Sequence, residues 1–180
     1  PLVEMTSGNL SFFNIEEKAK VNVNIAFADN DWGSSDCFRD PNIPFGPHGI
    51  DLVQREDGKF QLAVVSHHPK ESIEMFELKQ KDGWMLEWRG CVNVDGLYYF
   101  NDVSLDTSGG FYASHMFDSD FSLARALLNV FVKSNTGMAI KWSQDNNFEE
   151  LHYTAGSFPN GIALDQNNNN LIVNYNLGDK

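Results

Sequence analysis

The sequence is poor in cysteine, in basic residues and in long apolar runs, and each shortage excludes a class of protein. Two cysteines, Cys37 and Cys91, are too few for a disulfide-rich scaffold, and the sequence leaves open whether they pair. There are 13 basic and 25 acidic residues, and the net charge of -12 would repel the phosphates of a nucleic acid. No apolar run reaches the roughly 18 residues that a transmembrane helix needs. The acidic surplus fits solubility, cation binding, or both.

The chain consists mostly of short apolar or alternating runs separated by turn residues. Turn signals include Glu56-Asp57-Gly58 and Lys81-Asp82-Gly83. Many short strands at regular spacing predict an all-β fold, namely a sandwich, a barrel or a propeller. The strand-like runs are Leu10–Ile15, Val21–Phe27, Phe60–Val65, Ser72–Leu78, Trp84–Val94, Gly110–Ser114, Gly137–Trp142, Leu151–Thr154 and Asn170–Tyr175.

One stretch, residues 119–131, has the periodicity of a helix instead. Ser119 or Asp120 is suited to cap its N-terminus. The pattern favours a short helix packed on a sheet, and the alternative is a lid or membrane-facing helix that associates with a lipid surface. Its apolar stripe consists of Phe121, Ala124, Leu127, Leu128 and Phe131.

A degenerate repeat with a period of about 50–60 residues is the most informative feature of the sequence. Its copies are Pro47–Leu52, Phe100–Leu105 and Pro159–Leu164. The second residue of each copy has a polar side chain. Each copy precedes a turn and a further strand. A period of this kind predicts a β-propeller, in which every blade starts with an innermost strand beside a central channel.

Such a repeat would place the polar side chains of His48, Asn101 and Asn160 in a ring at one mouth of that channel. The propeller is therefore predicted to assemble a metal site from residues that lie far apart in the sequence. Strand alternation predicts that the apolar residues of the repeat are buried between blades. These residues are Ile50 and Leu52, Val103 and Leu105, and Ile162 and Leu164.

Four segments resemble the paraoxonase (serum arylesterase) family: PHGIDL at 47–52, VVSHHPKESIEMFEL at 64–78, FNDVSLDTSGGFYASHMF at 100–117 and FPNGIALDQNNNNLIVNY at 158–175. A related group, the senescence-marker and gluconolactonase-like lactonases, shares less of the histidine segments. The resemblance implies a six-bladed propeller, of which residues 1–180 would form about three to four blades, with further blades on both sides. It also favours a secreted or extracellular protein.

The resemblance further implies two calcium ions in the central tunnel, one catalytic and one structural. Asn101 and Asn160 match side-chain ligands of the catalytic ion. Asp102 matches a carboxylate ligand of the structural ion, and Ile50 matches the residue that provides a backbone carbonyl. Hard oxygen ligands of these kinds suit calcium.

By the same resemblance, His48 matches the base that deprotonates a water molecule, and His68 matches its partner in a histidine dyad. His67 stands where the family usually has asparagine. The implied reaction is hydrolysis of lactones and aryl esters, in which calcium polarises the carbonyl and the activated water attacks it. No GxSxG motif suggests a covalent serine intermediate.

The sequence departs from the family pattern in the acidic pair before the first blade and in the Asp-Asn pair of a later blade, which have no match here. Because an open propeller exposes apolar faces, we expect the isolated 180-residue chain to oligomerise, to misfold or to be part of a longer protein, and to bind calcium weakly. Two alternatives are a non-catalytic, calcium-stabilised propeller that binds a partner, and a strictosidine-synthase-like propeller with a catalytic glutamate and no metal. The histidines disfavour the first alternative, and the Asn101, Asp102 and Asn160 register disfavours the second.

Overall fold

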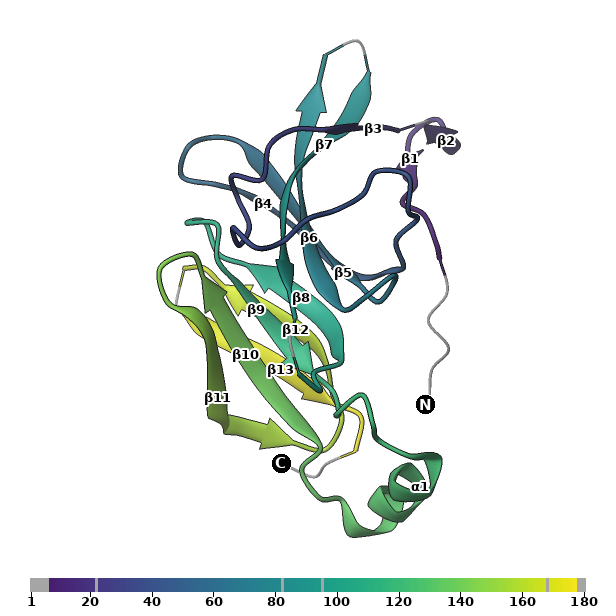
Figure 1. Ribbon diagram of the computed structural model, residues 1–180, viewed down its shortest axis with the longest axis vertical. Coiled ribbons are helices and arrows are strands. Elements are labelled where there is room, and N and C mark those ends of the chain that lie inside the picture. The colour runs from purple at the N-terminus through teal and green to yellow at the C-terminus, as the bar shows by residue number, and fades with distance from the viewer. Residues whose placement is uncertain (1–6, 22, 82, 95, 168, 178–180) are drawn as a thin grey trace.

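The computed structural model describes residues 7–177 apart from residues 22, 82, 95 and 168, and the regular secondary structure of this part of the chain consists mainly of β-strands (Figure 1). One short helix lies between the ninth and tenth strands. In chain order the elements are β1 (Phe12–Asn14), β2 (Ala19–Val21), β3 (Asn24–Phe27), β4 (Pro47–Gln54), β5 (Phe60–Ser66), β6 (Ser72–Gln80), β7 (Trp84–Asn93), β8 (Phe100–Leu105), β9 (Phe111–His115), α1 (Leu123–Val132), β10 (Gly137–Ser143), β11 (Asn147–Gly156), β12 (Pro159–Asp165) and β13 (Asn170–Tyr175).

The strands form successive antiparallel meanders, as the blades of a propeller do. The first blade has the strand order β3-β7-β6-β5-β4, in which only β3 runs parallel to its neighbour. The second blade has the order β11-β10-β9-β8, and β12 and β13 form the beginning of a third. The predicted all-β class with one short helix is confirmed. The described residues do not form a closed ring, and further blades on both sides stay a prediction.

The three copies of the sequence repeat form the strands β4, β8 and β12, and hydrogen bonds connect each of these strands to the next. Asp51 Oδ2 on β4 accepts a hydrogen bond from the Leu105 N–H on β8, at 2.8 Å. Asp102 Oδ2 on β8 accepts one from the Ile162 N–H on β12, at 3.1 Å. These bonds place the three repeats side by side, which is the arrangement that the period predicts.

The main apolar core lies between the first and second blades. Val65 and Met75 of the first blade pack there against Val103, Phe111 and Ile140 of the second, and all five side chains are almost completely buried. Two faces of different blades therefore exclude water from each other, and this burial supplies the main driving force that holds the blades together.

The prediction that all repeat residues are buried is wrong for β4. The side chain of Ile50 is 53% exposed and that of Leu52 is 48% exposed, because no described sheet covers this face of the first blade. The prediction is confirmed for β8 and holds in part for β12. There the repeat residues Val103, Leu105 and Ile162 are buried, and Leu164 is half-buried.

Helix α1 begins later than predicted and packs differently. Ser122, and not Ser119 or Asp120, is the N-cap, and its Oγ accepts a hydrogen bond from the Arg125 N–H at 3.3 Å. The predicted apolar stripe does not pack on a sheet: Leu127 and Phe131 are exposed, the latter by 85%. Asn129 is the buried residue of the helix. Phe121, which precedes the helix, and Ala126 within it make the apolar contact with the body of the protein.

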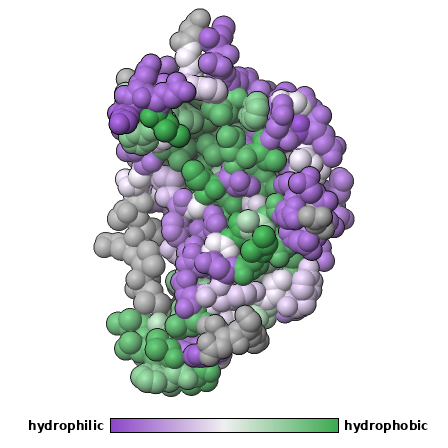
Figure 2. Space-filling model, turned by 180° about the vertical axis from the view of Figure 1, so that it is seen from behind, coloured by the Kyte–Doolittle hydropathy of each residue, from purple (hydrophilic) through white to green (hydrophobic). Residues whose placement is uncertain are grey.

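The exposed side chains of α1 form an apolar surface at the lower end of the molecule (Figure 2). Such a surface is what association with lipid requires, and that association stays a prediction. None of the described helices is long and apolar enough to cross a membrane.

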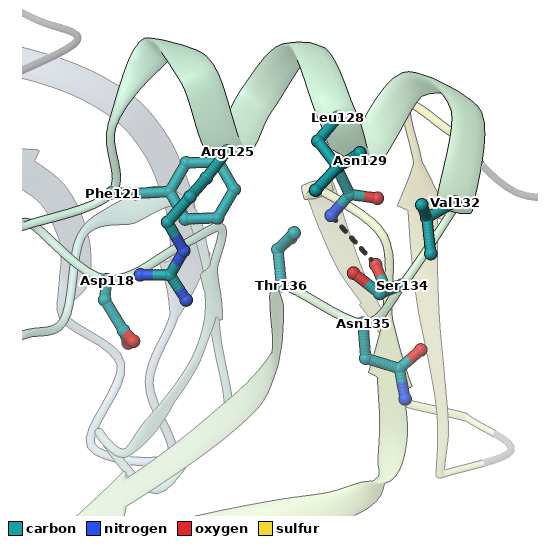
Figure 3. A pocket seen from close by; sticks show the side chains of 9 residues that line it. All are labelled: Asp118, Phe121, Arg125, Leu128, Asn129, Val132, Ser134, Asn135 and Thr136. Atoms are coloured by element: carbon teal, nitrogen blue, oxygen red, sulfur yellow. Dashed lines mark hydrogen bonds between the residues drawn. The ribbon is translucent and has the colours of Figure 1, made fainter.

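A small cavity of about 190 Å³ lies beneath α1 (Figure 3). Asn129 closes one side of it: its Nδ2 donates to the Ser134 carbonyl at 3.1 Å, and its Oδ1 accepts from Ser157 Oγ at 3.2 Å. Arg125 lies over the ring of Phe121, with 5.1 Å between the guanidinium carbon and the ring centroid. We interpret this polar cavity as part of the attachment of the helix.

The two cysteines are joined, which answers the question that the sequence left open. Cys37 lies in the long segment between β3 and β4, and Cys91 lies in β7, with 5.6 Å between the two Cα atoms. The disulfide therefore fixes this segment to the first blade.

Candidate active site

His48, His67 and Glu71 form a chain of hydrogen bonds at the edge of the first blade. His48 lies near the start of β4, His67 follows β5, and Glu71 precedes β6. His48 Nδ1 lies 3.0 Å from His67 Nε2, and His67 Nδ1 lies 2.7 Å from Glu71 Oε2. His67 and Glu71 are each only 8% exposed, whereas His48 is open to solvent.

This geometry determines which nitrogen of His48 can act as a base. The Glu71 carboxylate only accepts hydrogen bonds, so His67 Nδ1 carries a proton and, in the neutral imidazole, Nε2 accepts. His48 must then donate from Nδ1, which leaves the lone pair of its Nε2 free to take a proton from another molecule. Such an arrangement can serve as a base, an orienting imidazole and a carboxylate.

The predicted pairing of His48 with His68 is not the one that the structure shows. Pro47 of β4 is paired with Ser66 of β5, and the His67 N–H donates to the Gly46 carbonyl at 3.0 Å. This register places His67 beside His48. The imidazole of His68 has no hydrogen bond with any described residue, and only its backbone carbonyl accepts one, from Ser66 Oγ at 3.0 Å. His67, and not His68, is therefore the hydrogen-bonded neighbour of His48.

Glu71 was not identified from the sequence. Its second oxygen, Oε1, accepts a hydrogen bond at 2.7 Å from the N–H of Phe100, the first residue of β8. The carboxylate therefore connects the histidine pair of the first blade to the start of the second blade, next to Asn101. The sequence contains one indication of this contact, namely that Glu71 lies four residues after His67. Outside a helix, such a spacing does not predict that two side chains meet.

Tyr99 was also missed, and it covers one face of the His67 ring. The two ring centroids are 4.3 Å apart, and the planes differ by 7°. Phe117 stacks on the other face of Tyr99, at 4.9 Å and again at 7°. Because Tyr99 is buried and flat against His67, this stack restricts the rotation of the imidazole and keeps water from its face.

The surroundings of His48 and of His115 favour the neutral form of each imidazole. Partial burial, with a further contribution from His67, lowers the pKa of His48, and the Asp102 carboxylate opposes this effect. His48 is therefore unprotonated near neutral pH, as a base must be. Burial also lowers the pKa of His115, against the opposing influence of Asp118, whose Oδ1 lies 3.3 Å from His115 Nε2.

The predicted metal ligands Asn101, Asp102 and Asn160 lie at the adjoining starts of β8 and β12, and all three are half-buried. Ser114 Oγ accepts a hydrogen bond from the Asp102 N–H at 3.0 Å and donates one to the Asn160 carbonyl. A single hydroxyl thus connects the two strand starts.

Gly49 brings β4 to the same place. A Cβ atom at this position would lie 2.5 Å from both Cα and Oδ1 of Asp102, so only glycine permits the contact. His48 and Ile50 flank this glycine, and therefore the starts of all three repeats meet. That these residues bind a cation stays a prediction.

The oxygen atoms available here fit calcium in kind. They are the side-chain amide oxygens of Asn101 and Asn160, the carboxylate of Asp102 and the backbone carbonyl of Ile50. Within the described residues there is no group of three or more histidine, cysteine, aspartate or glutamate side chains placed to hold a metal ion. Three of the four predicted ligand groups are neutral, and oxygen ligands of this kind suit a hard cation.

Comparison with known families classifies the chain. The family model Arylesterase matches residues 32–179, which include the histidine pair, Glu71 and the starts of all three repeats. The chain belongs to the arylesterase family. No curated protein matches the chain. Membership identifies an ester-hydrolase type of enzyme that acts on small-molecule esters, at the level of the arylesterase family.

Proposed function

We propose that this arylesterase-family chain provides the catalytic base and part of the calcium site of a hydrolase that acts on lactones and aryl esters. The supporting observation is the hydrogen-bonded chain from His48 through His67 to the buried Glu71 carboxylate. A free lone pair on a neutral imidazole, backed by a carboxylate, is suited to deprotonating a water molecule.

In this proposal, His48 Nε2 takes a proton from water as the resulting hydroxide attacks the ester or lactone carbonyl. His48 then carries a positive charge, and its Nδ1–H bond to His67 Nε2 strengthens. The negative charge of Glu71 stabilises this state through the His67 ring, and Tyr99 keeps the ring in its orientation. The same proton is available for the leaving alkoxide, so the reaction needs no covalent enzyme intermediate.

Asn101 and Asn160 would hold the catalytic calcium ion, and Asp102 and the Ile50 carbonyl would hold the structural one. When bound, the catalytic ion would polarise the substrate carbonyl and stabilise the negative charge that develops on its oxygen. Ser114 maintains the spacing of the two strand starts that carry these oxygens.

The proposal is tested by hydrolysis of phenyl acetate and of a simple lactone by the full-length protein, with and without a calcium chelator. We expect the chelator to abolish turnover and added calcium to restore it. His48→Gln should lower kcat by roughly 10²–10⁴-fold, as expected when a general base is lost. His68→Gln is the matched control and should retain turnover. Undiminished turnover in chelator, or in the His48→Gln variant, would contradict the proposal.

A further inference from the structure

We propose that Asn9 is a site of N-linked glycosylation. The tripeptide Asn9-Leu10-Ser11 has the acceptor pattern of asparagine, a residue other than proline, and serine or threonine. None of the other asparagines in the 180-residue sequence is followed two residues later by serine or threonine. The inference does not depend on the proposed hydrolase activity.

The structure presents this tripeptide on the surface. Asn9 and Ser11 are exposed, whereas Leu10 between them is half-buried and packs against the apolar core of the first blade. The Gly8 N–H donates to the Phe45 carbonyl at 2.9 Å, which attaches the segment to the loop before β4. The acceptor side chain therefore projects from a segment that is fixed at its apolar side, and a glycan there displaces no packed residue.

The side chains of the tripeptide also have a suitable orientation toward each other. Ser11 Oγ donates a hydrogen bond to Asn9 Oδ1 at 3.3 Å. This bond involves the oxygen of the Asn9 side-chain amide. The nitrogen Nδ2, which is the atom that is modified, does not take part in it.

An independent observation indicates the compartment. The disulfide between Cys37 and Cys91 requires oxidising conditions, which are found in secretory compartments and outside the cell and are rare in the cytosol. N-linked glycans are attached along the same secretory route. The disulfide and the exposed acceptor pattern therefore agree, although they lie in different segments of the chain.

The modification is a group transfer from a lipid-linked N-acetylglucosamine donor. Asn9 Nδ2 forms a bond to C1 of the sugar, the bond from C1 to the lipid diphosphate breaks, and the diphosphate leaves with the bonding electrons. One amide proton of Asn9 passes to a base of the transferase. The other amide hydrogen remains on the glycosylated nitrogen.

The experiment is expression of the full-length protein behind a secretory signal in eukaryotic cells, followed by intact mass measurement before and after treatment with a peptide N-glycosidase. We expect the wild type to lose the mass of one glycan on treatment, and Asn9→Gln and Ser11→Ala to lack that mass from the start. Ser11→Thr should keep it. Asn146→Gln, which removes an exposed asparagine outside any acceptor pattern, should behave as the wild type.

The proposal is overturned if the secreted wild type has the mass of the unmodified polypeptide, or if the glycan remains in the Asn9→Gln variant. Peptide mapping gives the second readout, because the glycosidase converts the glycosylated Asn9 to aspartate and leaves an unmodified Asn9 unchanged. Neither measurement involves ester hydrolysis, so its failure is distinguishable from failure of the proposed function.

Discussion

The two carboxylate oxygens of Glu71 have different partners, and both partners are donors. Oε2 accepts from His67 Nδ1, and Oε1 accepts from the Phe100 N–H. A glutamine has one oxygen only, so in a Glu71→Gln variant one of these two positions must face an NH₂ group. If this group faces His67, the imidazole changes its tautomer, and His48 Nε2 then carries the proton and can no longer act as a base.

We therefore expect Glu71→Gln to lower kcat by about 10²–10⁴-fold, comparable with the loss of an orienting carboxylate in a catalytic triad. The measurement is the steady-state rate of phenyl acetate hydrolysis, with circular dichroism to confirm that the variant is folded. Glu56→Gln, a change of the same type on the exposed turn after β4, is the control. A Glu71→Gln variant with wild-type kcat would exclude the orienting role.

His115 makes a residue-level prediction about stability. Burial lowers its pKa in the folded state, so the unfolded chain binds a proton at a higher pH than the folded chain does. The free energy of unfolding should therefore fall as the pH drops below the ordinary histidine pKa of about 6.5. His115→Gln should make this fall shallower in urea titrations between neutral and mildly acidic pH. Asn146→Gln, which changes an exposed side chain that does not titrate, should leave the slope unaltered. A slope that His115→Gln does not change would contradict the prediction.

At the scale of secondary-structure elements, the stacked rings of His67, Tyr99 and Phe117 connect three segments of the chain. These are the segment after β5, the segment before β8 and the segment after β9. Tyr99→Phe keeps the stacked ring, and we expect kcat to change by less than about threefold. Tyr99→Ala removes it, and the loss of about 0.5–1.5 kcal/mol of aromatic contact predicts a fall in kcat of up to about tenfold. The measurement is kcat of both variants under the same conditions. Equal kcat values for Tyr99→Phe and Tyr99→Ala would mean that stacking does not position His67.

The disulfide is the other element-level feature with a measurable consequence. It closes a loop with a sequence separation of 54 residues, for which loop entropy alone predicts about 4 kcal/mol of stabilisation. The double variant Cys37→Ala/Cys91→Ala should show a reduced free energy of unfolding in guanidinium titrations, and reduced wild type should resemble it. An unchanged denaturation midpoint would mean that the loop is held by its packing alone.

At the scale of the whole molecule, the repeat predicted the features that depend on blade geometry. Polar positions at a regular period predict neighbouring strand starts, and β4, β8 and β12 are neighbours as expected. The partner of His48 could not be predicted in this way, because the choice between His67 and His68 depends on the pairing of Pro47 with Ser66. A shift of one residue reverses the face on which a side chain lies.

The other differences also arise from tertiary structure. Periodicity predicts that residues 119–131 contain a helix, but it does not indicate whether anything covers the apolar side of that helix. Phe131 is consequently exposed where packing on a sheet was favoured. In the same way, Ile50 follows the alternation of β4 correctly, and its exposure reflects the absence of a described sheet beside it. The local sequence pattern determines on which face of a strand or helix a side chain lies. The elements packed against that face determine whether the side chain is buried.

The hydrogen bonds between inner strands have a consequence for the order of assembly. Within a blade, every antiparallel pair joins strands that follow each other in the chain, whereas Asp51 and Asp102 reach residues 54 and 60 positions further on. The antiparallel part of each blade can therefore form from local contacts soon after its synthesis, and it then presents a carboxylate to which the next inner strand attaches. The chain would add its blades one at a time from the ribosome, with each completed blade serving as the template for its successor.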